Sequence, residues 1–166
     1  NFYECVVVGA GPGGIVATKE LVENGVDNIV CLEKSTSLGG VFARGYDSLQ
    51  LTSSATFSMF SDFLNKPGED NHFWSKEEAV DYWRRYADHF GVKGFIQFNT
   101  EVVNVERESG VWRITLDTNE IITAKRMVLA TGNNSVESYP EWSRELNEIK
   151  FSHSKHYKNA EPFVGK

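Results

Sequence analysis

A glycine-rich turn with the spacing G-x-G-x-x-G begins at Gly9, between an apolar run and a helical pattern. The apolar run, Cys5–Val8, predicts a buried strand, and the pattern over Ile15–Glu23 predicts a helix. In such a turn Gly9 permits the tight bend, Gly11 lets the backbone approach a pyrophosphate, and Gly14 lets the helix pack closely on the strand. The N–H groups and the positive dipole end at the start of the helix attract phosphate. A strand, a glycine turn and a helix in this order are typical of a dinucleotide site.

Glu33 ends a second apolar run, Ile29–Leu32, which predicts a neighbouring parallel strand. It lies 19 positions after Gly14 (33 − 14), and folds of this kind place a carboxylate about 20 residues beyond the glycine turn, on a ribose hydroxyl. A ligand recognised in this way carries a free 2′-hydroxyl on its adenosine ribose. A solvated strand end is the alternative interpretation of Glu33.

The composition argues against several other classes of protein. The chain has 166 residues, 40% hydrophobic and 24% charged, which is ordinary for one globular domain with a sizeable core. A net charge of −6 and the absence of any Lys/Arg run argue against a nucleic-acid or anionic-membrane surface. No apolar stretch approaches the roughly 20 residues of a membrane span, so we expect no membrane segment in this chain and a cytoplasmic location. A homo-oligomer is compatible with these properties.

The cysteines and histidines give no sign of redox or metal chemistry. Cys5 and Cys31 lie in the two predicted neighbouring strands, where we expect them to act as small buried hydrophobic residues. The absence of a C-x-x-C pair argues against a flavin-dependent disulfide reductase. The four histidines form no H-E-x-x-H motif or Cys/His cluster, so we expect no metal site.

The middle of the chain predicts two helices and an antiparallel meander. Ser75–Phe90 predicts a helix that opens with a capping box of Ser75 and Glu78. Its expected apolar stripe consists of Val80, Trp83, Ala87 and Phe90, and its Arg84 and Arg85 are expected on a solvated face. Thr56–Phe63 predicts a shorter helix, with Phe57, Phe60 and Phe63 directed to the core. A period of two predicts strands over Thr100–Glu106, Val111–Leu116 and Glu120–Ala124, followed by a last strand over Arg126–Ala130.

Two further features distinguish a flavin domain from a simple NAD domain. The last strand ends in Thr131 and Gly132, which should return to the crevice of the glycine turn, because ligands collect outside the carboxyl ends of parallel strands. The pair Gly39-Gly40 indicates backbone pressed against a flat ligand or a sharp turn. We therefore expect an α/β chain with a Rossmann-like FAD-binding fold of the glutathione-reductase type. It would combine a parallel sheet with a small antiparallel β-meander insertion.

Several motifs together resemble class B flavin-dependent monooxygenases, especially the flavin-containing monooxygenases. The resemblance covers nearly the whole chain. Besides the glycine turn, it rests on Leu32-Glu33-Lys34, Leu38-Gly39-Gly40-Val41-Phe42, Tyr46-Asp47-Ser48-Leu49, Phe60-Ser61-Asp62-Phe63, Tyr86-Ala87-Asp88-His89-Phe90, Ile96-Gln97-Phe98-Asn99-Thr100, Ala130-Thr131-Gly132 and His153-Ser154-Lys155-His156-Tyr157.

The resemblance implies that residues 1–166 form one FAD-binding domain, in which 137–166 connect to an NADPH-binding domain that this chain lacks. It implies an NADPH- and O₂-dependent monooxygenase that oxygenates nitrogen or sulfur of a small molecule through a C4a-(hydro)peroxyflavin. The fragment alone would be inactive. The alternatives are a Baeyer–Villiger, N-hydroxylating or indole-pyruvate monooxygenase, or a non-catalytic flavin-binding module.

The resemblance also assigns site residues. Asparagine is common in the family where this chain has Thr52, so Thr52 and Ser53 are weak candidates for catalytic groups. In the family's fingerprint Asn147 and Ile149 replace phenylalanine and glycine, which leaves His153 and Tyr157. The residues expected to bind FAD are Gly9, Ala10, Gly11, Pro12, Gly13, Gly14, Glu33, Lys34, Gly40, Val41, Phe42, Thr52, Val103, Thr131 and Gly132.

Overall fold

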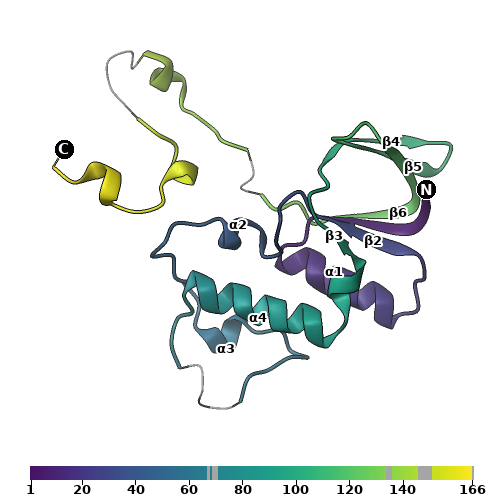
Figure 1. Ribbon diagram of the computed structural model, residues 1–166, viewed down its shortest axis with the longest axis horizontal. Helices are drawn as coiled ribbons and strands as arrows, with labels where there is room; N and C mark the ends of the chain where they lie inside the picture. Colours follow the sequence, from purple (N-terminus) through teal and green to yellow (C-terminus); the bar gives the residue numbers. More distant parts are fainter. Residues whose placement is uncertain (67, 69–70, 134–135, 146–150, 166) are drawn as a thin grey trace.

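The computed structural model describes residues 1–166 except 67, 69–70, 134–135, 146–150 and 166 (Figure 1). The described residues form a six-stranded sheet in the order β3-β2-β1-β6-β5-β4. The parallel strands are β1 (Phe2–Val8), β2 (Ile29–Leu32), β3 (Ile96–Gln97) and β6 (Ile121–Leu129). The antiparallel strands are β4 (Val102–Glu108) and β5 (Val111–Leu116). The predicted α/β class, with a parallel sheet and an antiparallel meander, is confirmed.

β6 corrects one detail of the prediction, which divided this region into two strands. It runs without interruption and pairs in parallel with β1, from Phe2 opposite Thr123 to Val8 opposite Leu129. Its first part also pairs antiparallel with β5, so the meander is continuous with the main sheet. The adjacent Lys125 and Arg126, which both lie near the Glu4 carboxylate, interrupt the apolar alternation. This interruption explains why the sequence pattern suggested a break.

Helices α1 (Pro12–Glu23) and α4 (Lys76–His89) lie on one side of the sheet (Figure 1). α1 begins three residues earlier than predicted, because the fixed φ of Pro12 suits the first helical position. α4 opens with the predicted capping box, in which the Glu78 N–H donates to the Ser75 hydroxyl and the Ser75 N–H donates to the Glu78 carboxylate. The short helices are α2 (Gly40–Ala43), α3 (Ala55–Ser58), η1 (Val92–Phe95), η2 (Glu141–Glu145), η3 (Ser154–His156) and η4 (Glu161–Phe163).

The helix predicted over Thr56–Phe63 is wrong for most of its length. α3 ends at Ser58, and tertiary hydrogen bonds hold the following loop: the Tyr82 hydroxyl accepts from the Phe60 N–H and donates to the Phe63 carbonyl, each at 2.7 Å. Phe60 and Phe63 pack against the core, as expected. Phe57 does not, because its side chain is 87% exposed.

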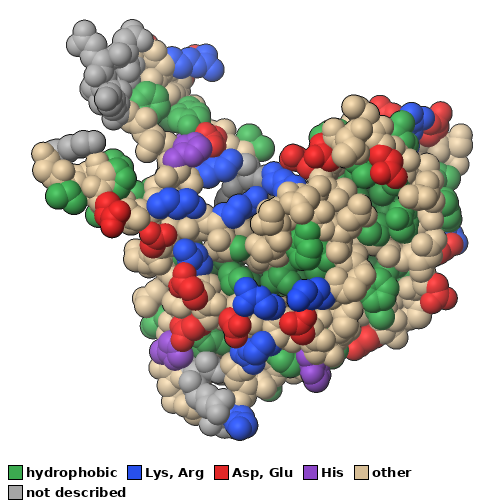
Figure 2. Space-filling model, in the orientation of Figure 1, with side chains coloured by type: hydrophobic (Ala, Val, Ile, Leu, Met, Phe, Trp, Pro, Cys, Tyr) green, Lys and Arg blue, Asp and Glu red, His purple; other side chains and the backbone are tan. Residues whose placement is uncertain are grey.

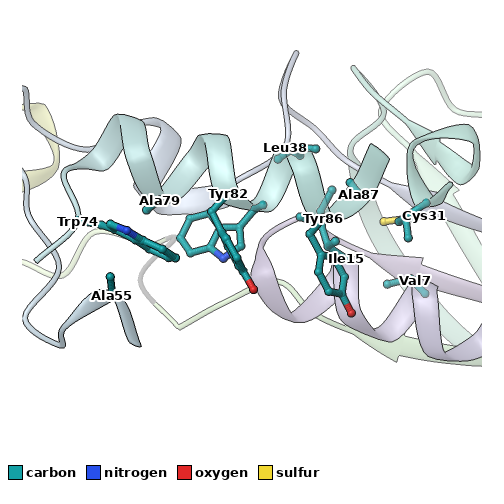
Figure 3. Close-up of a cluster of buried hydrophobic side chains, with 13 residues drawn as sticks. Val7, Ile15, Cys31, Leu38, Ala55, Trp74, Ala79, Tyr82, Tyr86 and Ala87 are labelled. Atoms are coloured by element: carbon teal, nitrogen blue, oxygen red, sulfur yellow. The ribbon is translucent and has the colours of Figure 1, made fainter. Parts of the chain in front are cut away.

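Each face of the sheet has its own apolar core. The core on the helix side contains aromatic side chains of α4, including Tyr82 and Tyr86, which the predicted stripe missed (Figure 3). On the opposite face, β4 and β5 curve over the parallel strands (Figure 1). The core there joins Val6, Val8, Val30 and Leu32 to Ile114, Leu116, Ile122 and Ala124. The exposed side of α4 carries mixed charges (Figure 2), and Arg84 and Arg85 pair there with Asp81, as expected for a solvated face.

Lys19 on α1 is a buried cation that forms an ion pair with the loop after α3. Its side chain is 7% exposed, and its ammonium nitrogen lies 2.6 Å from Glu23, 2.7 Å from Asp62 and 3.0 Å from Glu20. The hydrogen bond to Asp62 is the main reason why the pKa of Lys19 is raised, and the same bond lowers the pKa of Asp62. Asp62 also accepts from the Tyr86 hydroxyl at 3.2 Å. These contacts join α1, α4 and the loop between α3 and α4.

We expect Asp62→Asn to lower the melting temperature at pH 7 by several degrees, because Lys19 loses a charged partner. The folded pKa of Asp62 is below its unfolded value of about 3.9, so its stabilisation is present above that value and is lost as the pH falls through the folded pKa. The difference between wild type and variant should therefore disappear in acid. Thermal melts from pH 7 to pH 2 test this expectation, with the exposed Asp27→Asn as control. A difference that persists in acid would contradict it.

Candidate nucleotide-binding site

The glycine turn joins β1 to α1, and two of its glycines have no space for a side chain. Gly9 has φ +101°, and a Cβ there would lie 2.6 Å from the carbonyl oxygen of Ala130. A Cβ at Gly14 would lie 1.8 Å from the carbonyl oxygen of Gly9, much closer than real side chains approach. The structural roles predicted for Gly9 and Gly14 are therefore confirmed: the first permits the turn and the second permits close packing.

The second glycine pair packs against the first turn. The Gly39 N–H donates to the Ala10 carbonyl at 3.0 Å, and both Gly39 and Gly40 have positive φ. A Cβ at Gly40 would lie 3.3 Å from the Gly11 Cα. The pair thus forms the sharp turn that the sequence indicated, and it brings the backbones of Gly11 and Gly40 face to face.

The start of α1 is suited to an anion. No side chain caps it, and its first turn contains no acidic residue. Pro12 has no N–H, so the first backbone donors without a partner inside the helix belong to Gly13 and Gly14. These donors, together with the positive end of the helix dipole, favour a phosphate group at this position.

Glu33 is buried at the end of β2 and contacts the glycine turn directly. One carboxylate oxygen accepts from the Ala10 N–H at 2.7 Å, and the other accepts from the Ser35 N–H at 2.8 Å. Its residue exposure is 4%, so the alternative of a solvated strand end is wrong. Each oxygen keeps a second acceptor position, which a ribose hydroxyl can use.

The end of β6 reaches the same place. The Ala130 N–H donates to the Val8 carbonyl at 2.9 Å, and Thr131 follows directly beside Gly9. The carboxyl ends of β1, β2 and β6 therefore meet as predicted, with Thr131 and Gly132 exposed at their junction.

Lys34 follows Glu33 directly, and Val103 lies in β4, three residues after a residue that contacts the Glu33 backbone. The Thr100 N–H donates to the Glu33 carbonyl at 3.0 Å, and the Lys34 ammonium lies 3.4 Å from the Glu101 carboxylate. Val103 follows closely, at an irregularity in the pairing of β4 with β5, and its side chain is exposed. A role for Lys34 or Val103 at a cofactor stays a prediction.

The remaining predicted residues lie in two places: Val41 and Phe42 are in α2, and Thr52 and Ser53 are in the loop before α3. The Phe42 ring packs edge-on against Trp83 with centroids 5.1 Å apart, while Val41 is exposed beside it on α2. Ser53 is exposed, and its hydroxyl lies 2.8 Å from that of Ser58. Thr52 lines an open hollow of about 470 Å³, whose lining contains no residue of the glycine turn; the other lining residues are Tyr46, Ser48, Gln50, Leu51 and Phe73. A role for Thr52 or Ser53 at a cofactor stays a prediction.

Part of the chain near its end contacts the loop that follows α2 (Figure 1). The rings of Tyr46 and Tyr157 lie 6.1 Å apart, and His153 accepts from the Lys155 N–H. Glu137 accepts from the Tyr139 hydroxyl at 2.7 Å. This hydrogen bond is the main reason why the pKa of Glu137 is lowered to about 2. Asn147 and Ile149 of the expected fingerprint lie outside the described residues. The sequence patterns also missed Lys19, Ser35, Arg44 and Glu137, because no spacing motif marks their contacts.

The two cysteines are buried, as expected, at 1% and 0% exposure. Burial raises the pKa of both thiols, to about 11 for Cys31, which disfavours a reactive thiolate at neutral pH. The described residues contain no group of three or more His, Cys, Asp or Glu that could hold a metal ion. In the same part of the chain, no helix combines the length and apolar character needed to cross a lipid bilayer.

Known proteins are similar to this chain in both sequence and fold. The chain matches the pyridine nucleotide-disulphide oxidoreductase family over residues 6–166. It is 44% identical over 111 residues to a 4-hydroxybenzoate brominase (decarboxylating) of Marinomonas mediterranea, covering 65% of this chain and 21% of the relative. It is 34% identical to the indole-3-pyruvate monooxygenase YUCCA1 of Oryza sativa subsp. japonica, with coverage of 97% and 40%. Flavin-containing monooxygenase 5 of Cavia porcellus is 29% identical, with coverage of 96% and 34%.

Solved structures of monooxygenases also resemble the fold of this chain. The open crystal structure of cyclohexanone monooxygenase has a TM-score of 0.77 at 27% identity, covering 85% of this chain and 29% of that one. OTEMO, solved in complex with FAD and NADP, has a TM-score of 0.74 at 26% identity, with coverage of 84% and 27%. This chain spans less than half the length of all these relatives. The resemblance to flavin-containing monooxygenases is confirmed, and the match over residues 6–166 shows that the chain belongs to the pyridine nucleotide-disulphide oxidoreductase family.

Proposed function

We propose that this chain binds FAD and forms the FAD-binding part of an NADPH- and O₂-dependent flavin monooxygenase. The observation that carries the proposal is the convergence of the glycine turn, the buried Glu33 and the end of β6 at one edge of the sheet. Relatives and structural neighbours named as monooxygenases support it, and one neighbour was solved with FAD and NADP.

The residues present fit this cofactor. The uncapped start of α1 would hold the pyrophosphate, and the side-chain-free backbones of Gly11 and Gly40 would let the cofactor approach closely. Glu33 would accept from the adenosine ribose, with Lys34 and Val103 at the same end. Thr131 and Gly132 would border the cofactor at the end of β6.

FAD, when bound, supplies the redox chemistry, so this chain need only bind, orient and shield it. The family name includes disulphide chemistry, but Cys5 and Cys31 are free, buried and of raised pKa. These properties of the two cysteines favour a monooxygenase over a disulfide reductase. The absence of a predicted acid–base pair in the sequence agrees with a reaction carried mainly by the cofactor.

The substrate class we propose is a small molecule with a soft nitrogen or sulfur nucleophile, on the basis of the flavin-containing monooxygenase motifs. Oxygen insertion into ketones and halogenation are second candidates, since a cyclohexanone monooxygenase and a brominase are among the similar proteins. Product analysis of the full-length protein with NADPH and an amine, a sulfide, a ketone, or a phenol with bromide separates these reactions. Oxygenated amine or sulfide supports our proposal, whereas exclusive lactone or bromophenol formation contradicts it.

Glu33→Gln tests the ribose contact. The amide nitrogen of glutamine cannot accept from a backbone N–H, so the carboxamide cannot satisfy Ala10, Ser35 and a ribose hydroxyl as the carboxylate does. We expect FAD affinity to fall by about 1–3 kcal/mol, the contribution of a charged hydrogen bond. Fluorescence titration measures this change, and Glu108→Gln, which changes an exposed glutamate at the end of β4, is a control. Unchanged affinity in a folded Glu33→Gln variant would remove Glu33 from the site.

A further inference from the structure

A chain of hydrogen bonds joins the candidate ribose carboxylate to a residue outside the glycine turn. The Glu33 carboxylate accepts from the Ser35 N–H at 2.8 Å, and the Ser35 hydroxyl accepts from the Arg44 guanidinium at 3.0 Å. Arg44 directly follows α2, the short helix whose first residue faces the glycine turn. Arg44 is therefore connected to Glu33 through a single intermediate residue.

The backbone of Arg44 is in turn held by the segment Tyr157–Asn159, which we call the docked segment. The Lys158 ammonium donates to the Arg44 carbonyl oxygen, and the Lys158 carbonyl accepts from the Asp47 N–H at 2.8 Å. Asn159 donates from its side-chain amide to the Asp47 carboxylate at 2.8 Å. More than a hundred residues of chain separate these partners, so the docked segment makes a long-range contact with the loop that follows α2.

We propose that Arg44 is a positioning residue for cofactor binding and that it couples the docked segment to Glu33. The inference rests on the proposed FAD site. Arg44 restrains Ser35, and the Ser35 N–H fixes one oxygen of Glu33 while the Ala10 N–H fixes the other. The carboxylate then presents one orientation to a ribose hydroxyl. Docking and cofactor binding stabilise the same arrangement, so each strengthens the other, and this coupling is reciprocal.

A purely structural role for Arg44 would leave the dissociation constant for FAD unchanged when the side chain is removed. Exposed hydrogen bonds and ion pairs contribute little to stability, so loss of the Arg44 side chain should barely change the melting temperature without cofactor. If Arg44 acts through Glu33, its loss should instead appear in the dissociation constant for FAD. The two quantities, measured on the same variants, separate the two roles.

The experiment measures FAD dissociation constants by quenching of flavin fluorescence in wild type and variants. Arg44→Ala is expected to weaken binding about tenfold, and Arg44→Lys, which keeps a donor for Ser35, should recover most of the affinity. In a Glu33→Gln background Arg44→Ala should cause no further loss, because Arg44 acts through that carboxylate. Arg84→Ala, which removes an exposed arginine of α4, is the matched control and should keep wild-type affinity.

Because the coupling between cofactor binding and the docked segment is reciprocal, hydrogen exchange in the contact with that segment gives a second test that does not use affinity. Bound FAD should slow amide hydrogen exchange at Asp47, whose N–H donates to the docked segment, and Lys158→Met should abolish this protection. Wild-type affinity in Arg44→Ala, or full additivity with Glu33→Gln, overturns the inference and leaves the FAD site standing. If the wild-type protein itself does not bind FAD, both the inference and the proposed function are overturned.

Discussion

Replacing Gly14 by alanine is expected to destabilise the protein by about 3 kcal/mol or more, because the new methyl group has no space. Its Cβ would lie 1.8 Å from the Gly9 carbonyl oxygen, so either the glycine turn or the start of α1 must move. Neither can shift easily, since Gly9 is itself packed against Ala130. A loss of this size is a large fraction of the 5–15 kcal/mol that is typical for a whole domain. Urea unfolding measures it directly.

Gly13→Ala is a matched control one position earlier. A Cβ at Gly13 meets no atom within 4 Å, and the residue lies in the first turn of α1. This variant should therefore be as stable as wild type or gain about 0.4–1 kcal/mol from reduced freedom of the unfolded chain. A wild-type midpoint in Gly14→Ala would show that the turn and the helix are not packed as described.

Replacing Gly11 by valine is expected to weaken FAD binding by about 100-fold or more while the protein stays folded. Gly11 has φ −73°, which valine readily adopts, and a Cβ there has only the Gly40 Cα nearby, at 3.9 Å. The side chain would occupy the space through which a pyrophosphate approaches the start of α1. This variant therefore separates binding from folding, whereas Gly14→Ala affects the fold itself.

Fluorescence titration with FAD, together with a thermal melt, measures both quantities for Gly11→Val. Gly94→Val is a suitable control, because Gly94 lies in η1, a Cβ there meets nothing within 4 Å, and no candidate site residue is near it in the sequence. Wild-type FAD affinity in folded Gly11→Val would place the pyrophosphate elsewhere. Loss of folding would show that the space beside Gly11 is smaller than the structure indicates.

Features set by local chemistry could be predicted from the sequence. The glycine turn, the capping box of Ser75 and Glu78 and the burial of the two cysteines depend on residue type and short spacing, and the structure has them as expected. The meeting of Glu33 with the glycine turn was also predictable, because parallel strands bring their carboxyl ends to one edge.

Features set by distant partners could not be predicted. α3 ends early because the Tyr82 hydroxyl binds the backbone of the following loop from another helix. β6 continues through Lys125 and Arg126 because its backbone pairs with β1, where both side chains lie near Glu4. No pattern within either segment contains this information. The contacts of Lys19 with Asp62 and of the Arg44 carbonyl with Lys158 were missed for the same reason, since each partner is distant in sequence.

The central claim is that this chain binds FAD at the glycine turn, and its most direct test is the visible absorption spectrum of the purified protein after incubation with FAD and gel filtration. We predict a flavin spectrum that elutes with the protein at one flavin per chain and is lost in Gly11→Val. A wild-type protein that is folded but colourless after this treatment would contradict the claim.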